Sequence, residues 1–335
     1  MTGPRQSGKT TLVRSQLAHG TLRSLGDQGT VDAALGDPSG FLAFGQHGMR
    51  VFALAGMAEM MHYMADGAFG DVSMRVGDDL VATAEIRRPP DNFFDAGLIA
   101  ALADAYEWAG KAGARAIMLC SEGKHFCAGA DFTGRSSAGR VGGSGSGDDR
   151  GNGRGSTART LYDQALRLFE SPLPVVAAVQ GAAVGGGLGL ACSADFRVAS
   201  PQARFAANFA RLGLHQGFAL SATLPAIVGQ QHAWDLLYTG RRIGGDEAAA
   251  IGLADRLADA AGLREAAHAL AAQLAESAPL AIRAIRATMR EGLAARVRDA
   301  MDHELAEQEK LWPTADFAEG VRATAERRTP RFEGR

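Results

Sequence analysis

The sequence predicts an α/β protein, because apolar strands and helices alternate along it. Residues 95–113 (DAGLIAALADAYEWAGKAG) have the apolar spacing of an amphipathic helix, and residues 114–122 follow as a buried strand. Residues 174–181 (PVVAAVQG) predict a second buried strand, residues 184–194 a helix opened by glycines, and residues 195–200 a third strand. Alternation of this kind is typical of the α/β class.

Further elements lie on either side of this pattern. Residues 72–88 alternate strand-forming residues around a Gly-Asp-Asp turn, which predicts a hairpin. Residues 161–170 predict a helix, and the chain is mostly helical from residue 246 onward. We therefore expect a core at 71–250 and a C-terminal helical region at 251–335.

One segment inside the expected core is rich in glycine and serine. Residues 136–157 contain 13 Gly or Ser among 22 residues, and only two apolar side chains. Such a composition buries too little apolar surface to order itself, so we expect a mobile loop. It is either a lid over a site or a passive insertion.

The composition excludes several classes of function. The chain has 335 residues, 46% apolar and 21% charged, and a formal net charge of -2. This balance gives no reason to expect nucleic acid as a partner. Cys120, Cys127 and Cys192 lack the paired spacing of a disulfide framework or a zinc site, so no metal is expected. Neither a membrane span nor a signal peptide is visible, and the expected location is the cytoplasm.

The first residues carry a phosphate-loop pattern. In TGPRQSGKTT (2–11), Gly3, Gly8 and Lys9 match the conserved positions of the pattern G-x-x-x-x-G-K-[ST]. No buried strand leads into the loop, however. With GDPSGFLA further on, residues 1–44 resemble the start of an AAA-like ATPase. We expect a truncated, non-functional fragment, with an ATP-dependent protein using residues 3–10 as a remote alternative.

Between this fragment and the core, residues 45–70 contain a methionine stripe with helical spacing. Met57, Met60, Met61 and Met64 fit a packing face better than a ligand set. We expect a linker or an extra helix here.

Two glycine-containing stretches carry the chemistry. They are KHFCAGADF (124–132) and VQGAAVGGGLGLACSADF (179–196), and each follows a buried strand. In the second stretch, glycines open a helix and expose backbone N–H groups at the positive end of its dipole. Two such groups that converge form an oxyanion hole for a polarised carbonyl. Taken alone, the glycines are better explained by tight packing of the helix on the strand.

Together with AEIRRPPDNFFD, LYTGRRIGGDEAAAIGLAD and the tail DFAEGVRATAERRTPRFEGR, these stretches resemble the crotonase (enoyl-CoA hydratase/isomerase) superfamily over about residues 71–335. The resemblance implies a spiral of ββα repeats followed by helices that form trimers or dimers of trimers. It also implies that acyl-CoA thioesters bind, with coenzyme A as part of the substrate and no tightly bound cofactor.

The resemblance also assigns site residues. By position, the N–H groups of Ala128 and Gly186 form the oxyanion hole. The coenzyme A arm is expected along the first glycine-containing stretch, at Lys124, Phe126, Ala130, Asp131 and Phe132.

The departures from the family pattern concern the proton carriers. Hydratases of the family use two glutamates, and here Gly189 and Phe209 stand in their places. Neither residue can carry a proton. His215 is the best remaining titratable candidate, although a hydrogen-bonded loop histidine is the more common explanation. Asn208, Phe209 and Gln216 are candidates for the substrate pocket.

The predicted function is therefore an acyl-CoA enzyme of the hydratase or isomerase type. It stabilises a thioester enolate but lacks the usual acid/base pair. Two alternatives remain open: a non-catalytic acyl-CoA-binding homologue, and an acyl-CoA hydrolase that uses His215.

Overall fold

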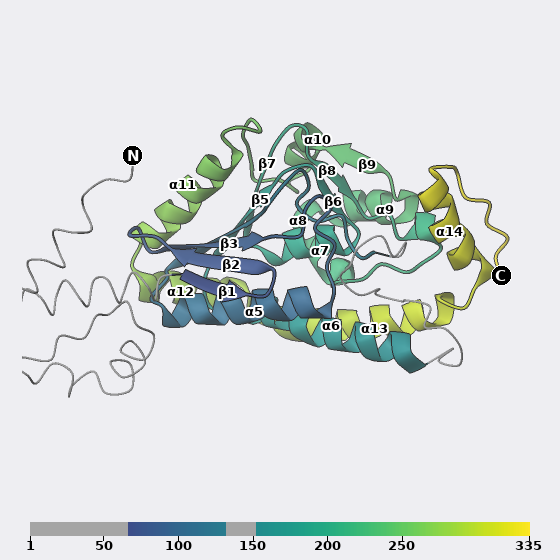
Figure 1. Cartoon of the computed structure of the whole chain (residues 1–335), viewed down its shortest axis with the longest axis horizontal. Helices are drawn as coiled ribbons and strands as arrows, with labels where there is room; N and C mark the ends of the chain where they lie inside the picture. Colours follow the sequence, from purple (N-terminus) through teal and green to yellow (C-terminus); the bar gives the residue numbers. More distant parts are fainter. Residues whose placement is uncertain (1–65, 132–151) are drawn as a thin grey trace, which may run out of the picture. The chain divides into compact units, whose positions relative to one another are not determined.

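A computed structural model describes residues 66–131 and 152–335, and within this part the predicted α/β class is confirmed (Figure 1). Its large sheet has seven strands in the order β1-β2-β3-β4-β5-β7-β10. The first three strands pair antiparallel, and the strands from β3 to β10 pair parallel. These strands are β1 (Asp66–Phe69), β2 (Val72–Val76), β3 (Val81–Ile86), β4 (Ala116–Ser121), β5 (Val175–Val179), β7 (Phe196–Ala199) and β10 (Arg256–Leu257).

Helices cover both faces of the parallel strands. Along β4, Met118 and Cys120 pack with α11 (Leu263–Glu276), while Ile117 and Leu119 belong to the larger core on the opposite face. Successive strand residues point to opposite faces, so a strand buried on both sides reads as a continuous apolar run. This is why residues 114–122 and 174–181 could be recognised as strands.

The larger core lies between this sheet and the remaining helices (Figure 1). Figure 1 shows α11 on one side of the large sheet and α5 on the other. The helices before the C-terminal region are α5 (Ala96–Lys111), α6 (Asn152–Glu170), α7 (Gly186–Ser193), the short 3-10 helix η1 (Ala210–Leu212), α8 (Leu220–Val228), α9 (Gln230–Thr239) and α10 (Gly245–Ala250).

A second sheet of three strands stands beside the large one. It consists of β6 (Ala182–Val184), β8 (Arg204–Ala206) and β9 (Arg242–Gly244), with β8 in the centre. The C-terminal region then adds α12 (Pro279–Met289), α13 (Leu293–Leu311) and α14 (Ala315–Glu326). Together, β6 and α14 contribute to one cavity, described below.

The structure corrects two predicted boundaries. Residues 66–69 are strand β1 paired with β2, so this end of the expected linker at 45–70 belongs to the large sheet. Helix α6 begins at Asn152, so the last residues of the expected loop at 136–157 are helical. The phosphate-loop fragment at 1–44, the rest of the 45–70 segment and most of the loop lie outside the described residues.

Candidate active site

The two glycine-containing stretches meet where β6 runs into α7. Cys127 and Ala183 form an isolated parallel bridge, in which Cys127 N–H donates to Ala182 O at 2.9 Å and Val184 N–H donates to Cys127 O at 3.1 Å. A second bridge joins Phe94 to Ala130. Three segments far apart in the sequence are thus fixed to one another by backbone hydrogen bonds.

Two of the glycines permit this close approach. A Cβ atom on Gly187 would lie 2.1 Å from the Cys127 carbonyl oxygen, so any side chain would push the two segments apart. Gly129 has a φ of +94° and faces the Val184 carbonyl, which a Cβ would approach to 2.7 Å. The same Cβ would lie 3.9 Å from Gly186 N, which places Gly129 directly beside the start of α7.

The structure corrects one of the two expected oxyanion donors. The N–H of Ala128 is already engaged, because it donates to the Asp91 carbonyl oxygen at 2.9 Å. The N–H groups of Ala130 and Gly186 have no acceptor among the described residues, and both residues line the cavity. Gly186 opens α7, where a backbone N–H has no intrahelical partner. The pair of free donors is therefore Ala130 and Gly186.

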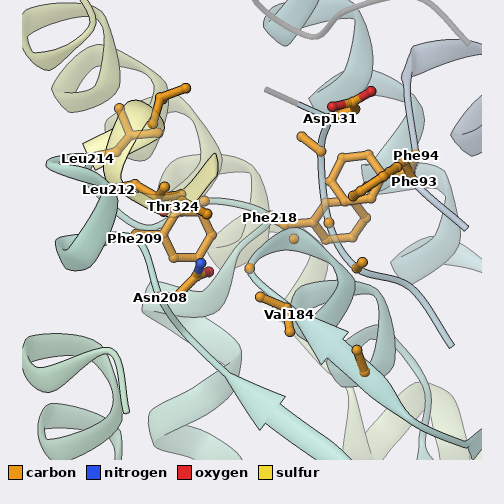
Figure 2. A pocket seen from close by; sticks show the side chains of 18 of the residues that line it. Phe93, Phe94, Asp131, Val184, Asn208, Phe209, Leu212, Leu214, Phe218 and Thr324 are labelled. Carbon is orange, nitrogen blue, oxygen red and sulfur yellow. The ribbon is translucent and has the colours of Figure 1, made fainter. Parts of the chain in front are cut away.

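These donors face a cavity of about 440 Å³. Figure 2 shows Phe94 and Phe218 on one side of it and Phe209, Leu212 and Leu214 on the other, with the Asn208 amide beside the Phe209 ring. The Phe94 and Phe218 rings are 5.5 Å apart between centroids and tilted by 59°. The region next to the free N–H groups is thus mainly aromatic.

The two positions at which the family pattern has glutamates carry no acid here. Phe209 lines the cavity with its own ring. Gly189 lies under Phe218, whose Cβ would be 2.6 Å from a Cβ at position 189. A phenylalanine thus occupies both places: Phe209 stands at one of the two positions, and Phe218 fills the space beside Gly189 at the other.

His215 and Gln216 are not among the residues that line the cavity. His215 Nδ1 lies 2.9 Å from the Gln216 carbonyl oxygen, and the His215 ring contacts the His303 ring edge to face. Gln216 donates to the Ser221 hydroxyl at 3.0 Å. His215 thus lies outside the cavity lining, between the lining residues Leu214 and Gly217, and its role as a proton carrier stays a prediction.

The expected coenzyme A residues separate into three groups. Ala130 and Asp131 line the cavity, and Asp131 is buried. Phe126 lies fully inside the core, so its ring cannot contact a ligand. Lys124 is exposed but lies outside the lining, and Phe132 lies outside the described residues. The expectation for Phe126 is wrong, because its side chain is fully buried in the core.

Asn92 holds the loop that leads into the site. This fully buried amide donates to the carbonyl oxygens of Glu122 and His125 at 2.8 and 2.6 Å, and its Oδ1 accepts from Arg88 N–H. A buried amide with three hydrogen bonds is costly to disturb. The sequence offered a signal, an asparagine beside two prolines and two phenylalanines, but not its partners.

Two titratable groups at the site have pKa values that burial controls. Burial raises the pKa of the Cys127 thiol to about 12, which excludes a thiolate nucleophile near neutral pH. Burial also lowers the pKa of His125, and the Asp91 carboxylate opposes this shift. His125 Nδ1 accepts the Ala182 N–H at 3.2 Å, which favours the neutral ring.

The comparison with known proteins agrees with this geometry. Residues 78–335 match the family model described as enoyl-CoA hydratase/isomerase. The chain belongs to this family. Among curated relatives, an enoyl-CoA isomerase/hydratase of Zymoseptoria tritici is 36% identical over 67% of this chain and 72% of its own length. A probable enoyl-CoA hydratase of Bacillus subtilis is 32% identical over 77% of this chain and 96% of its own.

Solved structures of the family confirm the crotonase fold. An enoyl-CoA hydratase/isomerase from Pseudoalteromonas atlantica superposes with a TM-score of 0.65 at 28% identity, over 78% of this chain and all of that one. Within residues 66–131 and 152–335, none of the helices combines the length and the apolar composition that a membrane span requires. The same part holds no cluster of His, Cys, Asp or Glu suited to a metal ion.

Proposed function

We propose that this member of the enoyl-CoA hydratase/isomerase family binds an acyl-CoA thioester and stabilises its enolate. The observation that carries the proposal is the pair of free N–H groups, Ala130 and Gly186, at one aromatic-lined cavity. The thioester oxygen would accept a hydrogen bond from each. Coenzyme A enters as part of the substrate.

Such donors act where negative charge develops. When a proton is lost from, or a nucleophile adds to, an unsaturated thioester, charge moves onto the carbonyl oxygen. Fixed N–H groups then bind the transition state more strongly than the ground state. The surrounding phenylalanine rings make the cavity less polar than water, which strengthens the interaction with the oxygen. The reaction would be of the hydratase or isomerase type on an enoyl-CoA.

A second candidate is a homologue that binds acyl-CoA without turnover. It is favoured by the replacement of both glutamates and by the rings that occupy their places, at Phe209 and over Gly189. Hydrolysis through His215 stays a further alternative, and its ring lies outside the cavity lining.

We also propose that the chain forms a homo-oligomer, a trimer or a dimer of trimers, in which α12 contributes to the contact. In this helix the charged side chains point inward and large apolar side chains are exposed. Arg286 and Arg290 point inward and hold Asp195 at 2.9 and 3.1 Å, while Leu280 and Met289 are each 79% exposed. Large apolar side chains that are this exposed are typical of an interface.

Turnover of crotonyl-CoA tests the reaction, measured as loss of the conjugated thioester absorbance. The oxyanion assignment needs a matched pair of variants, because a Cβ at position 186 would clash with the Phe94 ring at 2.3 Å. In a Phe94→Ala background, Gly186→Ala keeps the N–H and Gly186→Pro removes it. Loss of one oxyanion donor lowers the rate by about 100-fold or more.

The outcomes separate the two candidates. A rate that falls only in the proline variant supports the enzyme. Tight acyl-CoA binding without turnover by the wild-type chain supports the non-catalytic homologue. Equal rates in folded alanine and proline variants would sink the assignment of Gly186.

A further inference from the structure

Two arginines lie together on the three-stranded sheet at the cavity. Strands β8 and β9 are antiparallel, with Arg204 opposite Gly244 and Ala206 opposite Arg242. Residues two apart on a strand share a face, and directly opposed residues share it too. Arg204 and Arg242 are therefore diagonal neighbours on one face, within reach of each other's long side chains. Both line the cavity.

Neither arginine side chain has a partner within the described residues 66–131 and 152–335. Both residues are exposed, and neither side chain forms a hydrogen bond or an ion pair there. The adjacent Arg241 differs, because its guanidinium binds both Asp235 and Glu247 at 2.6 Å. One arginine of the Arg241-Arg242 pair thus stabilises the fold, and the other faces the cavity unpaired.

The acids that line the cavity, Asp91 and Asp131, form no ion pair with either arginine within the described residues. Asp91 lies 3.9 Å from His125 Nε2, and Arg204 acts on the same imidazole, opposing its protonation. Asp131 is buried with 3% of its surface exposed. Two like charges placed side by side repel each other unless an anion lies between them.

We propose that Arg204 and Arg242 form an anion subsite at the cavity and that its ligand is a phosphate group of coenzyme A. This inference rests on the proposed function, since it assumes that an acyl-CoA is the ligand. Guanidinium groups bind phosphate through paired, charge-assisted hydrogen bonds, which suits two arginines that share one face. The subsite would anchor the nucleotide end of the substrate while the N–H groups of Ala130 and Gly186 hold the thioester.

The test compares three thioesters by calorimetry with the full chain: butyryl-CoA, its 3′-dephospho form and S-butyryl-pantetheine, which has no phosphate ester. Arg204→Ala and Arg242→Ala remove the subsite one residue at a time. Arg298→Ala is the matched control, because this exposed arginine of α13 also lacks a partner among the described residues but lies outside the lining.

We expect each cavity variant to weaken butyryl-CoA binding by about tenfold, the effect of one charge-assisted hydrogen bond. Binding of S-butyryl-pantetheine should be the same in all variants, and Arg298→Ala should match the wild type throughout. An equal loss for the 3′-dephospho form assigns the subsite to the diphosphate, and a loss absent there assigns it to the 3′-phosphate.

Two results would overturn the proposal, and they differ from a failure of the proposed function. One is butyryl-CoA binding within twofold of wild type in both cavity variants. The other is an equal loss for S-butyryl-pantetheine, which would place the arginines at the acyl group. If the folded wild-type chain binds no thioester at all, the proposed function fails and the subsite with it.

Discussion

Phe218 occupies the space that a side chain at Gly189 would need. A Cβ at 189 would lie 2.6 Å from the Phe218 Cβ and 2.8 Å from its carbonyl oxygen. Phe218 is held there with a φ of +59°, and Ala219 has the same value. Backbone in this region costs about 1–3 kcal/mol per residue and persists only where its surroundings impose it. A glutamate at position 189 would therefore need a different path of the 218–219 backbone, and not only a change of the residue at 189.

Substitution of Gly189 tests this relationship. Gly189→Ala should destabilise the protein by about 1–3 kcal/mol, as overpacking of a filled core does. Gly110→Ala is the control, because a Cβ at this glycine of α5 would meet nothing within 4 Å. It should be neutral or stabilising by up to about 1 kcal/mol. Urea unfolding measures both, and equal effects would contradict the packing of Phe218 on Gly189.

Glu304 explains why the backbone keeps positive φ values at Phe218 and Ala219. This fully buried carboxylate of α13 accepts the N–H groups of Ala219 and Ser221, each at 2.8 Å, at the start of α8. Gln308, one turn later, donates to the carbonyl oxygens of His215 and Gln216. Helix α13 thus holds the segment that presents Phe218 to the cavity.

Removal of the carboxylate should loosen this segment. Glu304→Ala leaves two buried N–H groups without acceptors and should cost about 2–4 kcal/mol of unfolding free energy. Glu309→Ala, at an exposed position of the same helix, should cost little. If the two variants unfold at the same urea concentration, Glu304 does not hold the segment.

Glu304 also gives a pH dependence with a definite sign. Burial, the largest cause, raises the pKa of Glu304, although hydrogen bonds from Ser221 and Ala219 oppose it. A carboxyl group with a raised pKa in the folded state binds its proton more tightly there than when unfolded. Its contribution is fully present below the unfolded value of about 4.3 and is lost as the pH rises through the folded pKa.

The measurement compares wild type with Glu304→Gln, which does not titrate. The stability of wild type minus that of Glu304→Gln should fall as the pH rises from about 4 through the raised pKa. A difference that stays flat or grows with pH would show that the hydrogen bonds outweigh burial.

The family resemblance implied that the two glycine-containing stretches act together, and the structure shows that they follow β4 and β5, which are neighbouring strands of one sheet. The sequence did not predict which N–H is free. That depends on the turn at Gly129 and on the Asp91 carbonyl, which lies 37 positions before Ala128 in the chain and takes the Ala128 N–H. Likewise, the sequence shows only that position 189 has no side chain, and not what fills the space beside it. Its occupant, Phe218, comes from a loop whose shape is set by Glu304.

The cysteines provide a test of burial at the site. Burial raises the pKa values of Cys120 and Cys192 to about 11 and that of Cys127 to about 12. At pH 8 the thiolate fraction is then about a thousandth or less. A disulfide reagent should leave the native protein unmodified for hours and titrate three thiols after unfolding. Fast reaction of one native thiol, located by mass spectrometry at Cys127, would contradict the closed packing behind the proposed oxyanion donors.

The exposed apolar side chains of α12 lead to the last prediction. Ile285 is 58% exposed and lies one helical turn before the exposed Met289, while Arg286 and Arg290 pack inward against Asp195. A charge placed among these apolar side chains should break an interface without disturbing the monomer, because their contacts within the chain are few. Ile285→Arg should therefore shift the mass measured by light scattering from oligomer to monomer.

The control is Ala261→Arg, at an exposed turn before α11, which should leave the oligomer intact. Urea unfolding separates a loss of assembly from a loss of fold in the Ile285 variant. An oligomer of unchanged mass in that variant would place the contact elsewhere. A wild-type chain that is monomeric at all concentrations would leave the outer face of α12 without a function in assembly.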